Sequence, residues 1–362
     1  MKILIGGGGT GGHIYPALAL ARYAQLKDSA NDILFVGTEK GMESQIVPSA
    51  GFPLKTVPVR SFERNLKQFG SAVINLINSL SQSSKIINEY RPNVILGTGG
   101  YVAAPLVISG LLKRYPVVLH EQNVHPGLVN RKLAPFVKRV CLSFAETEQW
   151  MPRFSRVLFT GNPRASEVSS LTRAAACRYF NLDPDYKNIL VYGGSRGALK
   201  LNQVVTAYLN AGLLPEGVNL IYVTGEIYYR EVSAKLGKLS DRIRLYSYLD
   251  QMPKALAAAD LAVTRSGATT LAEITALGVP ALLIPSPNVV NNHQYYNARL
   301  LADAEAAVLI EEKDFDFRRL QQEVEYLLKE PALLEEMKKK SIKMSAADAA
   351  ERLYRCLQEV SS

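Results

Sequence analysis

Residues 2–16 read KILIGGGGTGGHIYP, and this stretch decides the fold. A short apolar run is followed by a cluster of glycines and then by a helical pattern, as a first strand is followed by a first helix in an α/β protein. Glycine costs conformational entropy, so the cluster indicates a place where a ligand, often a phosphate, approaches the backbone. Gly7, Gly9 and Gly12 fit G-x-G-x-x-G, which alone is a weak signal, and a tight turn without a ligand is the alternative.

The second half of the chain repeats this design, because NILVYGGSRGA at 188–198 is again an apolar run followed by a glycine turn. Three further pairs of segments correspond in the same order: NDILFVGTE (31–39) and VNLIYVTGE (218–226), PNVILGTGGY (92–101) and ADLAVTRSGAT (259–269), YPVVLHEQN (115–123) and VPALLIPSP (279–287). Apolar runs alternate with helix-length segments, which predicts parallel strands buried on both faces. We therefore expect two doubly wound, Rossmann-like α/β domains that face each other across a cleft, with ligand loops at the carboxyl ends of the strands.

The length of the chain indicates the number of domains, and a break in the alternation of strands and helices indicates the boundary between them. A chain of 362 residues suffices for about two domains. Gly161 and Pro163 interrupt the pattern in TGNPRAS (160–166), so the expected domains are residues 1–160 and 161–344.

Composition excludes several classes of protein. The three cysteines, at positions 141, 177 and 356, lie far apart, which fits a reducing compartment and argues against a disulfide scaffold or a clustered zinc site. The first apolar run is too short for a signal peptide, and the longest, at 103–112, is too short to span a bilayer. We therefore expect a protein of the cytoplasm or of the cytoplasmic face of a membrane.

The positive charge is concentrated in the first half of the chain. The net charge is +9, and residues 1–160 hold 18 Lys+Arg and 9 Asp+Glu, whereas residues 161–362 hold 24 of each. Such asymmetry indicates an anionic partner for the first half, namely nucleic acid, an anionic bilayer or a phosphorylated substrate. A solubilising surface is the plain alternative.

One helical segment of the first half bears on this choice. Six apolar residues recur at helical spacing and predict a core face: Leu66, Phe69, Val73, Leu76, Ile77 and Leu80. Ile74 points away from them and has Arg64 and Lys67 nearby. It is therefore either a contact to a membrane surface or an isolated exposed residue.

Two loops of the second half suit a nucleotide. GGSRGA (193–198) can turn its backbone N–H groups and the Ser195 hydroxyl towards a phosphate, assisted by the dipole of the following helix. In TRSGATTLAE (264–273), Glu273 lies one helical turn beyond Thr269, where a carboxylate can accept both hydroxyls of a ribose. Alternatively, Glu273 is a first-turn residue favoured by the helix dipole.

His13 is the best candidate for acid–base chemistry. It follows the glycine turn and precedes Pro16, which predicts a position near a helix N-terminus facing the cleft. The positive end of the helix dipole favours a neutral ring, which can accept a proton. Glu121 and Asn123, which follow the run VVLH, are expected to reach the same cleft. No spacing of His, Cys and Asp suggests a metal, and the motif G-x-x-x-x-G-K-[ST] of NTP hydrolysis is not present in the sequence.

Six motifs occur in a characteristic order: GGTGGH, LGTGGYV (96–102), HEQN (120–123), GGSRGA, TRSGATTLAE and HQYYNA (293–298). Together they resemble the MurG family of bacterial peptidoglycan N-acetylglucosaminyltransferases over nearly the whole chain. The resemblance implies the GT-B architecture, with a C-terminal helix (345–362) that packs back on the first domain. It also implies that GlcNAc is moved from UDP-GlcNAc to the muramoyl 4-hydroxyl of lipid I, an undecaprenyl-pyrophosphoryl pentapeptide. The product is lipid II, formed with inversion at the anomeric carbon and without a cofactor or a metal.

The resemblance also implies roles for individual residues. His13 matches the residue usually discussed as the base, Glu121 is the runner-up, and Asn123 matches an asparagine of the cleft. The residues that match substrate-binding positions are Thr10, Gly11 and Gly12 in the first loop, Arg164 at the diphosphate, Ser195 at a phosphate, Leu249 at the uracil, Ala268, Thr269, Thr270, Leu271, Ala272 and Glu273 in the nucleotide loop, with Glu273 on the ribose, and Gln294 at the sugar hydroxyls. Some members read GNPxR where this chain reads GNPRA, so Arg164 lies one residue early.

The partners implied are UDP-GlcNAc, lipid I and an anionic membrane surface, so the expected location is peripheral, on the cytoplasmic side of the cell membrane. Cell-wall or division-complex proteins are further candidates. The alternatives are a UDP-GlcNAc 2-epimerase, which has the same fold but needs no basic first half, and a transferase with another lipid-linked acceptor. Nucleic acid is not expected, because the aromatic–basic interleaving of single-strand binders is absent from the sequence.

Overall fold

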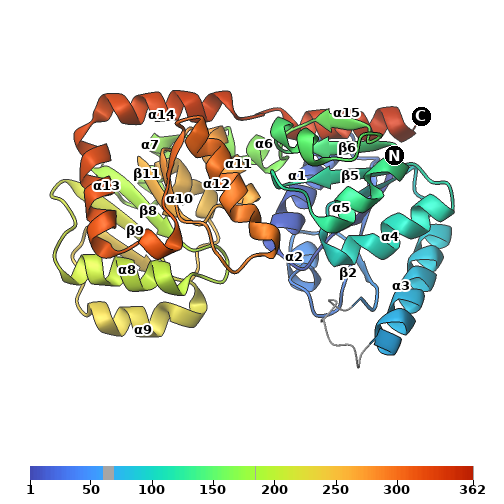
Figure 1. Ribbon diagram of the computed structural model, residues 1–362, viewed down its shortest axis with the longest axis horizontal. Coiled ribbons are helices and arrows are strands. Elements are labelled where there is room, and N and C mark those ends of the chain that lie inside the picture. Colours follow the sequence, from blue (N-terminus) through green and yellow to red (C-terminus); the bar gives the residue numbers. More distant parts are fainter. Residues whose placement is uncertain (60–68, 184, 362) are drawn as a thin grey trace. The chain divides into compact units, whose positions relative to one another are not determined.

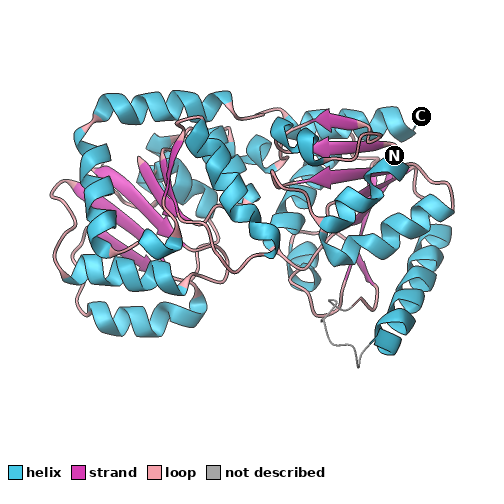
Figure 2. Ribbon diagram, viewed as in Figure 1, coloured by secondary structure: helices cyan, strands magenta, loops and turns pink. Residues whose placement is uncertain are grey.

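The computed structural model describes residues 1–59, 69–183 and 185–361, and the chain divides into two compact units. Unit 1 comprises residues 1–167 and 346–362, and unit 2 comprises residues 168–345. In each unit a sheet is flanked by helices (Figure 1, Figure 2). No helix among the described residues is long and apolar enough to cross a membrane.

Unit 1 contains a seven-stranded parallel sheet in the order β3-β2-β1-β4-β5-β6-β7. Its strands are β1 (Lys2–Gly6), β2 (Asp32–Gly37), β3 (Leu54–Thr56), β4 (Val94–Gly97), β5 (Val117–Glu121), β6 (Arg139–Leu142) and β7 (Val157–Phe159). Its helices are α1 (Gly11–Lys27), α2 (Glu43–Ser49), α3 (Phe69–Tyr90), α4 (Gly100–Leu112), α5 (Leu128–Leu133), α6 (Arg164–Val168), which reaches the change of unit, and α15 (Ala349–Ser361), with short 3-10 turns at Ala134–Phe136 and Ala145–Trp150.

Unit 2 contains a six-stranded parallel sheet in the order β10-β9-β8-β11-β12-β13. Its strands are β8 (Lys187–Tyr192), β9 (Val218–Val223), β10 (Ile243–Tyr246), β11 (Leu261–Thr264), β12 (Ala281–Leu283) and β13 (Ala307–Leu309). Its helices are α7 (Arg173–Tyr179), α8 (Leu199–Asn210), α9 (Glu226–Leu236), α10 (Met252–Ala258), α11 (Ala268–Leu277), α12 (His293–Asp303), α13 (Phe317–Lys329) and α14 (Pro331–Lys343), with short 3-10 turns at Val290–Asn292 and Glu312–Asp314.

The internal repeat seen in the sequence is a repeat of topology. The four paired segments form β1 and β8, β2 and β9, β4 and β11, and β5 and β12, which take the same places in the two sheets. The prediction of two doubly wound domains with buried parallel strands is therefore confirmed. In each sheet the chain changes direction between two central strands, β1 and β4 in unit 1 and β8 and β11 in unit 2. Ligands of such folds bind at the carboxyl ends of the strands at this switch point.

The last helix, α15, belongs to unit 1 although it follows unit 2 in the chain. It packs against α1 and against strands β4, β5 and β6. Leu353, Cys356 and Leu357 of this helix are buried in the same apolar cluster as Ile3 and Ile5 of β1. Burial of this apolar face is what holds the end of the chain on unit 1.

The predicted core face of residues 66–80 is wrong at Leu76 and Ile77, whereas Leu80 is half-buried. Leu66 lies outside the described residues, as do the side chains of Phe69 and Val73. Ile77 is 59% exposed and Leu76 is 37% exposed, whereas Ile74 is exposed as expected. The buried face of α3 begins with hydroxyl residues and becomes apolar only later: Ser79 and Ser83 are buried, followed by Ile86 and Ile87, and Ser79 Oγ donates to the Pro58 carbonyl at 2.9 Å. A search for apolar periodicity cannot find a face of this composition.

Candidate functional site

Four glycine-containing loops lie at the two switch points. In unit 1 the first glycine loop (residues 6–13) follows β1 and the segment 97–100 follows β4. In unit 2 the loop 193–198 follows β8, and Gly267 precedes α11, which follows β11. The fold therefore gathers each pair of motifs at one sheet edge, where a ligand is expected.

Packing within unit 1 explains part of the glycine cluster. A Cβ atom at Gly7 would lie 1.9 Å from Thr98 Oγ1, and one at Gly8 would lie 2.4 Å from the carboxyl carbon of Glu43. Gly12 differs, because the nearest atom to a Cβ there would be Thr10 Oγ1 at 3.6 Å. Gly7 and Gly8 thus let neighbouring side chains approach the backbone, whereas Gly12 has space beside it for something larger.

His13 lies in the first turn of α1, as predicted, and its ring is held in one orientation. Its Nδ1 faces two acceptors, the carbonyl oxygen of Thr98 at 2.9 Å and Oε1 of Gln122 at 3.0 Å. The ring lies against Gly99 and Gly100, which have φ of +97° and +76°, and a Cβ at Gly99 would lie 3.0 Å from it. Two acceptors at Nδ1 place the proton there, so Nε2 carries the lone pair that can accept a proton.

The amide of Gln122 is oriented by its own partners. Its Nε2 donates to the Thr98 carbonyl at 2.7 Å and faces Nδ1 of His120 at 3.0 Å, which turns Oε1 towards His13. Nε2 of His120 in turn donates to the Gly161 carbonyl at 3.1 Å. Burial lowers the pKa of His120 to about 4, so this ring is neutral at pH 7 and can accept at Nδ1. A chain of hydrogen bonds therefore fixes the tautomer of His13.

Glu121, the alternative base, is buried and holds a loop. Its Oε1 accepts from the backbone N–H of Asn123 at 2.9 Å and from the side chain of Asn123 at 3.3 Å. Its Oε2 accepts from the N–H of Gly127 at 3.0 Å and from Nδ2 of Asn130 at 2.8 Å. Both oxygens are engaged by donors, so the geometry favours His13 over Glu121 as the base. Asn123, half-buried, lies beside Glu121 in this loop.

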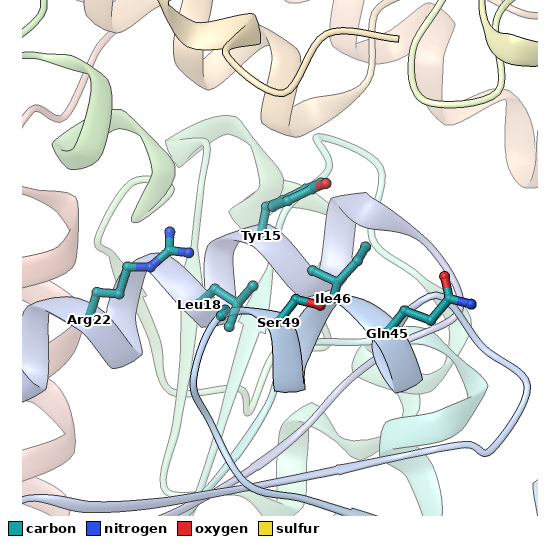
Figure 3. Close-up of a pocket in the computed structure, with 7 residues that line it drawn as sticks. Tyr15, Leu18, Arg22, Gln45, Ile46 and Ser49 are labelled. Atoms are coloured by element: carbon teal, nitrogen blue, oxygen red, sulfur yellow. The ribbon is translucent and has the colours of Figure 1, made fainter.

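An open pocket of about 260 Å³ lies next to the first glycine loop, between α1 and α2 (Figure 3). Helix α1 contributes Tyr15 and Arg22, and α2 contributes Gln45, Ile46 and Ser49. A Cβ at Gly11 would lie 3.0 Å from the Tyr15 ring, so the pocket and the loop share a wall.

Arg164 lies in unit 1, close to this pocket. Its guanidinium pairs with Glu167 and lies 5.5 Å from the centre of the Tyr15 ring. Glu167 also pairs with Arg22 at 2.8 Å. The carboxylate thus joins two arginines, and Arg164 has an ionic partner from its own chain.

The nucleotide-binding candidates of unit 2 lie at the carboxyl ends of its strands. Ser195 is exposed in the loop between β8 and α8, where Gly194 and Gly197 have φ of +87° and +72°. Leu249 is half-buried in the turn between β10 and α10. The N-terminus of α8, which follows the loop, offers the positive end of a helix dipole to an anion.

The residues around α11 form the second part of this set. Ala268, Leu271 and Ala272 are buried, Thr269 and Thr270 are half-buried, and Glu273 is 7% exposed. Burial, together with the nearby negative charge of Glu273, raises the pKa of Tyr192 at the end of β8.

Gln294 in the first turn of α12 is tied to two neighbouring loops. Its Oε1 accepts from the N–H of Ser286 at 2.9 Å, and its carbonyl accepts from the hydroxyl of Ser266 at 2.7 Å. Ser266 precedes α11, so Gln294 joins the loops after β11 and β12.

Sequence reasoning assigned no role to Thr98, His120, Gln122 or Glu43. The first three lie in the quoted motifs LGTGGYV and HEQN, which was the available signal, whereas no motif contains Glu43. Within residues 1–59, 69–183 and 185–361, no group of three or more His, Cys, Asp or Glu side chains could hold a metal ion.

The chain belongs to glycosyltransferase family 28: the family's N-terminal domain model matches residues 3–142 and its C-terminal domain model matches residues 188–353. Within that family it groups with the MurG transferases. A protein of Halalkalibacterium halodurans, named UDP-N-acetylglucosamine–N-acetylmuramyl-(pentapeptide) pyrophosphoryl-undecaprenol N-acetylglucosamine transferase, is 40% identical over 363 residues, which cover 99% of both chains.

Solved structures agree with this assignment. MurG of Acinetobacter baumannii matches with a TM-score of 0.78 at 27% identity, over 99% of both chains. A UDP-GlcNAc 2-epimerase of Neisseria meningitidis, bound to UDP-GlcNAc, matches with a TM-score of 0.70 at 14% identity, over 99% of this chain and 100% of its own. At that identity the likeness to the epimerase concerns the fold alone. The GT-B architecture expected from the sequence is confirmed.

Proposed function

We propose that this protein transfers N-acetylglucosamine from UDP-GlcNAc to the muramoyl 4-hydroxyl of lipid I and so makes lipid II. The observation that carries the proposal is the full-length likeness, at 40% identity, to a transferase of that name. The geometry of unit 1 supports the same chemistry, because a hydroxyl nucleophile needs a positioned base.

In this reaction His13 is the base. The proton on Nδ1 stays there, hydrogen-bonded to the Thr98 carbonyl and Gln122 Oε1, so Nε2 takes the proton of the attacking hydroxyl. The hydroxyl oxygen bonds to the anomeric carbon while the bond from that carbon to the UDP oxygen breaks. The donor sugar is α-linked, so a single in-line displacement gives the β product. The two oxygens at Nδ1 then stabilise the imidazolium that forms.

Unit 2 binds the donor. Loop 193–198, with Ser195 and the N-terminus of α8, receives the diphosphate, whose developing charge the helix dipole stabilises. Glu273 accepts hydrogen bonds from the ribose hydroxyls, the backbone of Leu249 contacts the uracil, and Gln294 forms hydrogen bonds with the sugar hydroxyls.

A transfer assay tests the proposal. The full chain, incubated with UDP-GlcNAc labelled in the sugar and with a short-chain lipid I analogue, should give a labelled disaccharide lipid and UDP. Formation of UDP-ManNAc from UDP-GlcNAc alone, without transfer, would identify an epimerase instead. Transfer only to another lipid-linked sugar would reject lipid I as the acceptor.

We further propose that unit 1 binds an anionic membrane surface through an α3–α4 patch, defined as Ile74, Ile77, Leu112, Lys113 and Arg114. The three apolar side chains are 61%, 59% and 76% exposed. Ser109 Oγ of α4 donates to the Leu80 carbonyl of α3 at 3.1 Å, which brings the second half of α4 beside the middle of α3, and the two helices lie side by side in unit 1 (Figure 1). Exposed apolar side chains beside basic ones favour the interface of an anionic bilayer.

Vesicle flotation tests this location. The full chain should bind vesicles of phosphatidylglycerol more strongly than those of phosphatidylcholine, and salt should weaken the binding because it screens the charges. Ile77→Asp should reduce binding, whereas Leu26→Asp, a matched change at an 86% exposed position of α1, should not. Equal binding to both kinds of vesicle, or an unaffected Ile77→Asp variant, would contradict the patch.

A further inference from the structure

We propose that Glu43 is a positioning residue for the transfer reaction, because its buried carboxylate fixes the first glycine loop in the shape that presents His13. The part that concerns transfer rests on the proposed function, whereas the part that concerns the loop does not.

The contacts of Glu43 reach the loop directly. Glu43 is the first residue of α2 and is 0% exposed. Its Oε2 accepts from the backbone N–H of Gly9 at 2.9 Å. Its Oε1 accepts from the backbone N–H of Thr38 at 2.9 Å and from the Thr38 hydroxyl at 2.7 Å. The carboxylate thus connects the loop after β1 to the turn after β2, the neighbouring strand.

The surrounding glycines leave room for this one side chain. A Cβ at Gly8, Gly37 or Gly41 would lie 2.4, 2.5 and 2.3 Å, respectively, from an atom of Glu43. Gly9, which donates to the carboxylate, has φ of +81°, a conformation that favours glycine. Glycines from two loops therefore enclose the carboxylate, which explains why the turn after β2 contains glycine as well.

The hydrogen bonds from the loop are made to an ionised carboxylate of Glu43. Burial raises the pKa of a carboxyl group, but the hydrogen bonds from Thr38, Gly9 and the backbone of Glu43 itself outweigh it, and the pKa of Glu43 lies below its ordinary value. A charged acceptor makes stronger hydrogen bonds than a neutral one, so the Gly9 N–H is held firmly.

Thr98 holds the loop on its other side. On the side of β4, Thr98 Oγ1 donates to the His13 carbonyl at 3.0 Å, and the Thr98 carbonyl faces His13 Nδ1. Glu43 holds the loop four residues before His13, on the side of β2. On the β2 side the backbone N–H of Gly7 also donates to the Val36 carbonyl at 3.4 Å, so loss of Glu43 would release the loop at Gly9 rather than at its start, and His13 would be presented less accurately.

Glu43→Gln in the full chain tests the inference. Glutamine has nearly the same size, but its NH₂ group cannot accept from Gly9 or Thr38. We expect kcat with the lipid I analogue to fall about tenfold or more, while the KM for UDP-GlcNAc stays within about twofold. Hydrogen exchange should quicken in peptides covering residues 6–13 and stay unchanged at 193–198.

Two further variants make the test independent of folding defects. Gly8→Ala places a Cβ 2.4 Å from the carboxyl carbon and so displaces Glu43 without changing its charge. Gly8→Ala should lower kcat and quicken exchange in residues 6–13 as Glu43→Gln does. The double variant, which combines the two changes, should lose no more kcat than either single variant. Glu89→Gln, a change at an exposed carboxylate of the same unit that pairs with Lys55, is the matched control and should change nothing.

The outcomes separate the possibilities. Unchanged loop exchange and kcat in Glu43→Gln would overturn the proposal, as would an even loss of protection across unit 1. If Glu43→Gln does not fold, Gly8→Ala decides alone, and full activity in that variant overturns the proposal. A wild-type chain without transfer activity would overturn the proposed function, and the exchange experiment would still decide whether Glu43 holds the loop.

Discussion

The loops after β1 and β8 occupy the same place in two like sheets, yet they are held by different chemistry. The first glycine loop is held by the buried carboxylate of Glu43 and by Thr98. In the loop 193–198, a Cβ at Gly197 would lie 2.2 Å from the Thr224 carbonyl, and the same carbonyl accepts from Nδ2 of Asn202 at 2.9 Å. Unit 1 therefore places a negative charge under its loop, whereas these contacts of unit 2 are neutral.

The difference shows how one backbone design can serve two tasks. A loop whose N–H group already donates to a carboxylate of its own chain is rigid and disfavours a second anion, which suits the positioning of a base and a sugar. A loop packed closely against a neutral backbone carbonyl leaves the dipole of the following helix to a diphosphate. We therefore expect changes in unit 1 to affect turnover and changes in unit 2 to affect donor binding.

His13→Ala should have the largest effect. A positioned base contributes about 10²–10⁴-fold to such reactions, so turnover should fall by that factor. Affinity for UDP, measured by titration calorimetry, should stay near the wild-type value, because the groups proposed to bind it lie in unit 2. Full turnover in His13→Ala would reject the assignment and make Glu121 the leading base.

The pH dependence of stability should reveal the hydrogen-bond chain of unit 1. Burial lowers the pKa of His120 from 6.5 to about 4, so as the pH falls the unfolded chain binds a proton first. The stability due to the neutral ring is fully present above pH 6.5 and is lost as the pH falls through about 4, by about 3 kcal/mol. Urea unfolding followed by the fluorescence of Trp150, the single tryptophan, reports on unit 1. His120→Asn should flatten this dependence, and an equally steep one in the variant would contradict the mechanism.

Glu273→Ala should affect the donor alone. A lost hydrogen bond to a charged group costs about 1.5–3 kcal/mol, so the KM for UDP-GlcNAc should rise about tenfold or more while the KM for the acceptor stays constant. Glu231→Gln, an exposed carboxylate change on α9 of the same unit, is the control. An unchanged KM for the donor in Glu273→Ala would reject its role at the ribose.

Local signals were sufficient to predict the fold and the position of His13. Strands, glycine turns and their repetition are contiguous in the sequence, so two doubly wound domains and a histidine at a helix N-terminus could be inferred before any contact was known. The candidate residues of unit 2 were found through motifs in the same way, and their roles stay predictions.

Contacts between distant segments could not be predicted in this way. Glu43 meets Gly9 because β2 pairs with β1 and the two strands end at the same edge of the sheet, a pairing that no short stretch encodes. Gln122 likewise meets His13 across 109 positions of sequence. Such partners are set by the sheet order, and a single carboxylate or amide carries no local sign of the loop it will hold.

Gln122→Leu should have the smallest effect and should separate the two units most clearly. Leucine is of similar size but offers no acceptor to His13 Nδ1, so one of its two partners is lost while the Thr98 carbonyl remains. Loss of one such hydrogen bond corresponds to about tenfold in turnover. Because Gln122 acts through His13, Gln122→Leu should not lower turnover further in a His13→Ala background. The effects of groups that act as a unit are not additive. In a double variant that combines Gln122→Leu with Glu273→Ala, a change in the other unit, the two losses in kcat/KM for the donor should multiply. A Gln122→Leu variant that loses a further tenfold without His13 would show that the amide acts on the substrate itself rather than on the tautomer of the base.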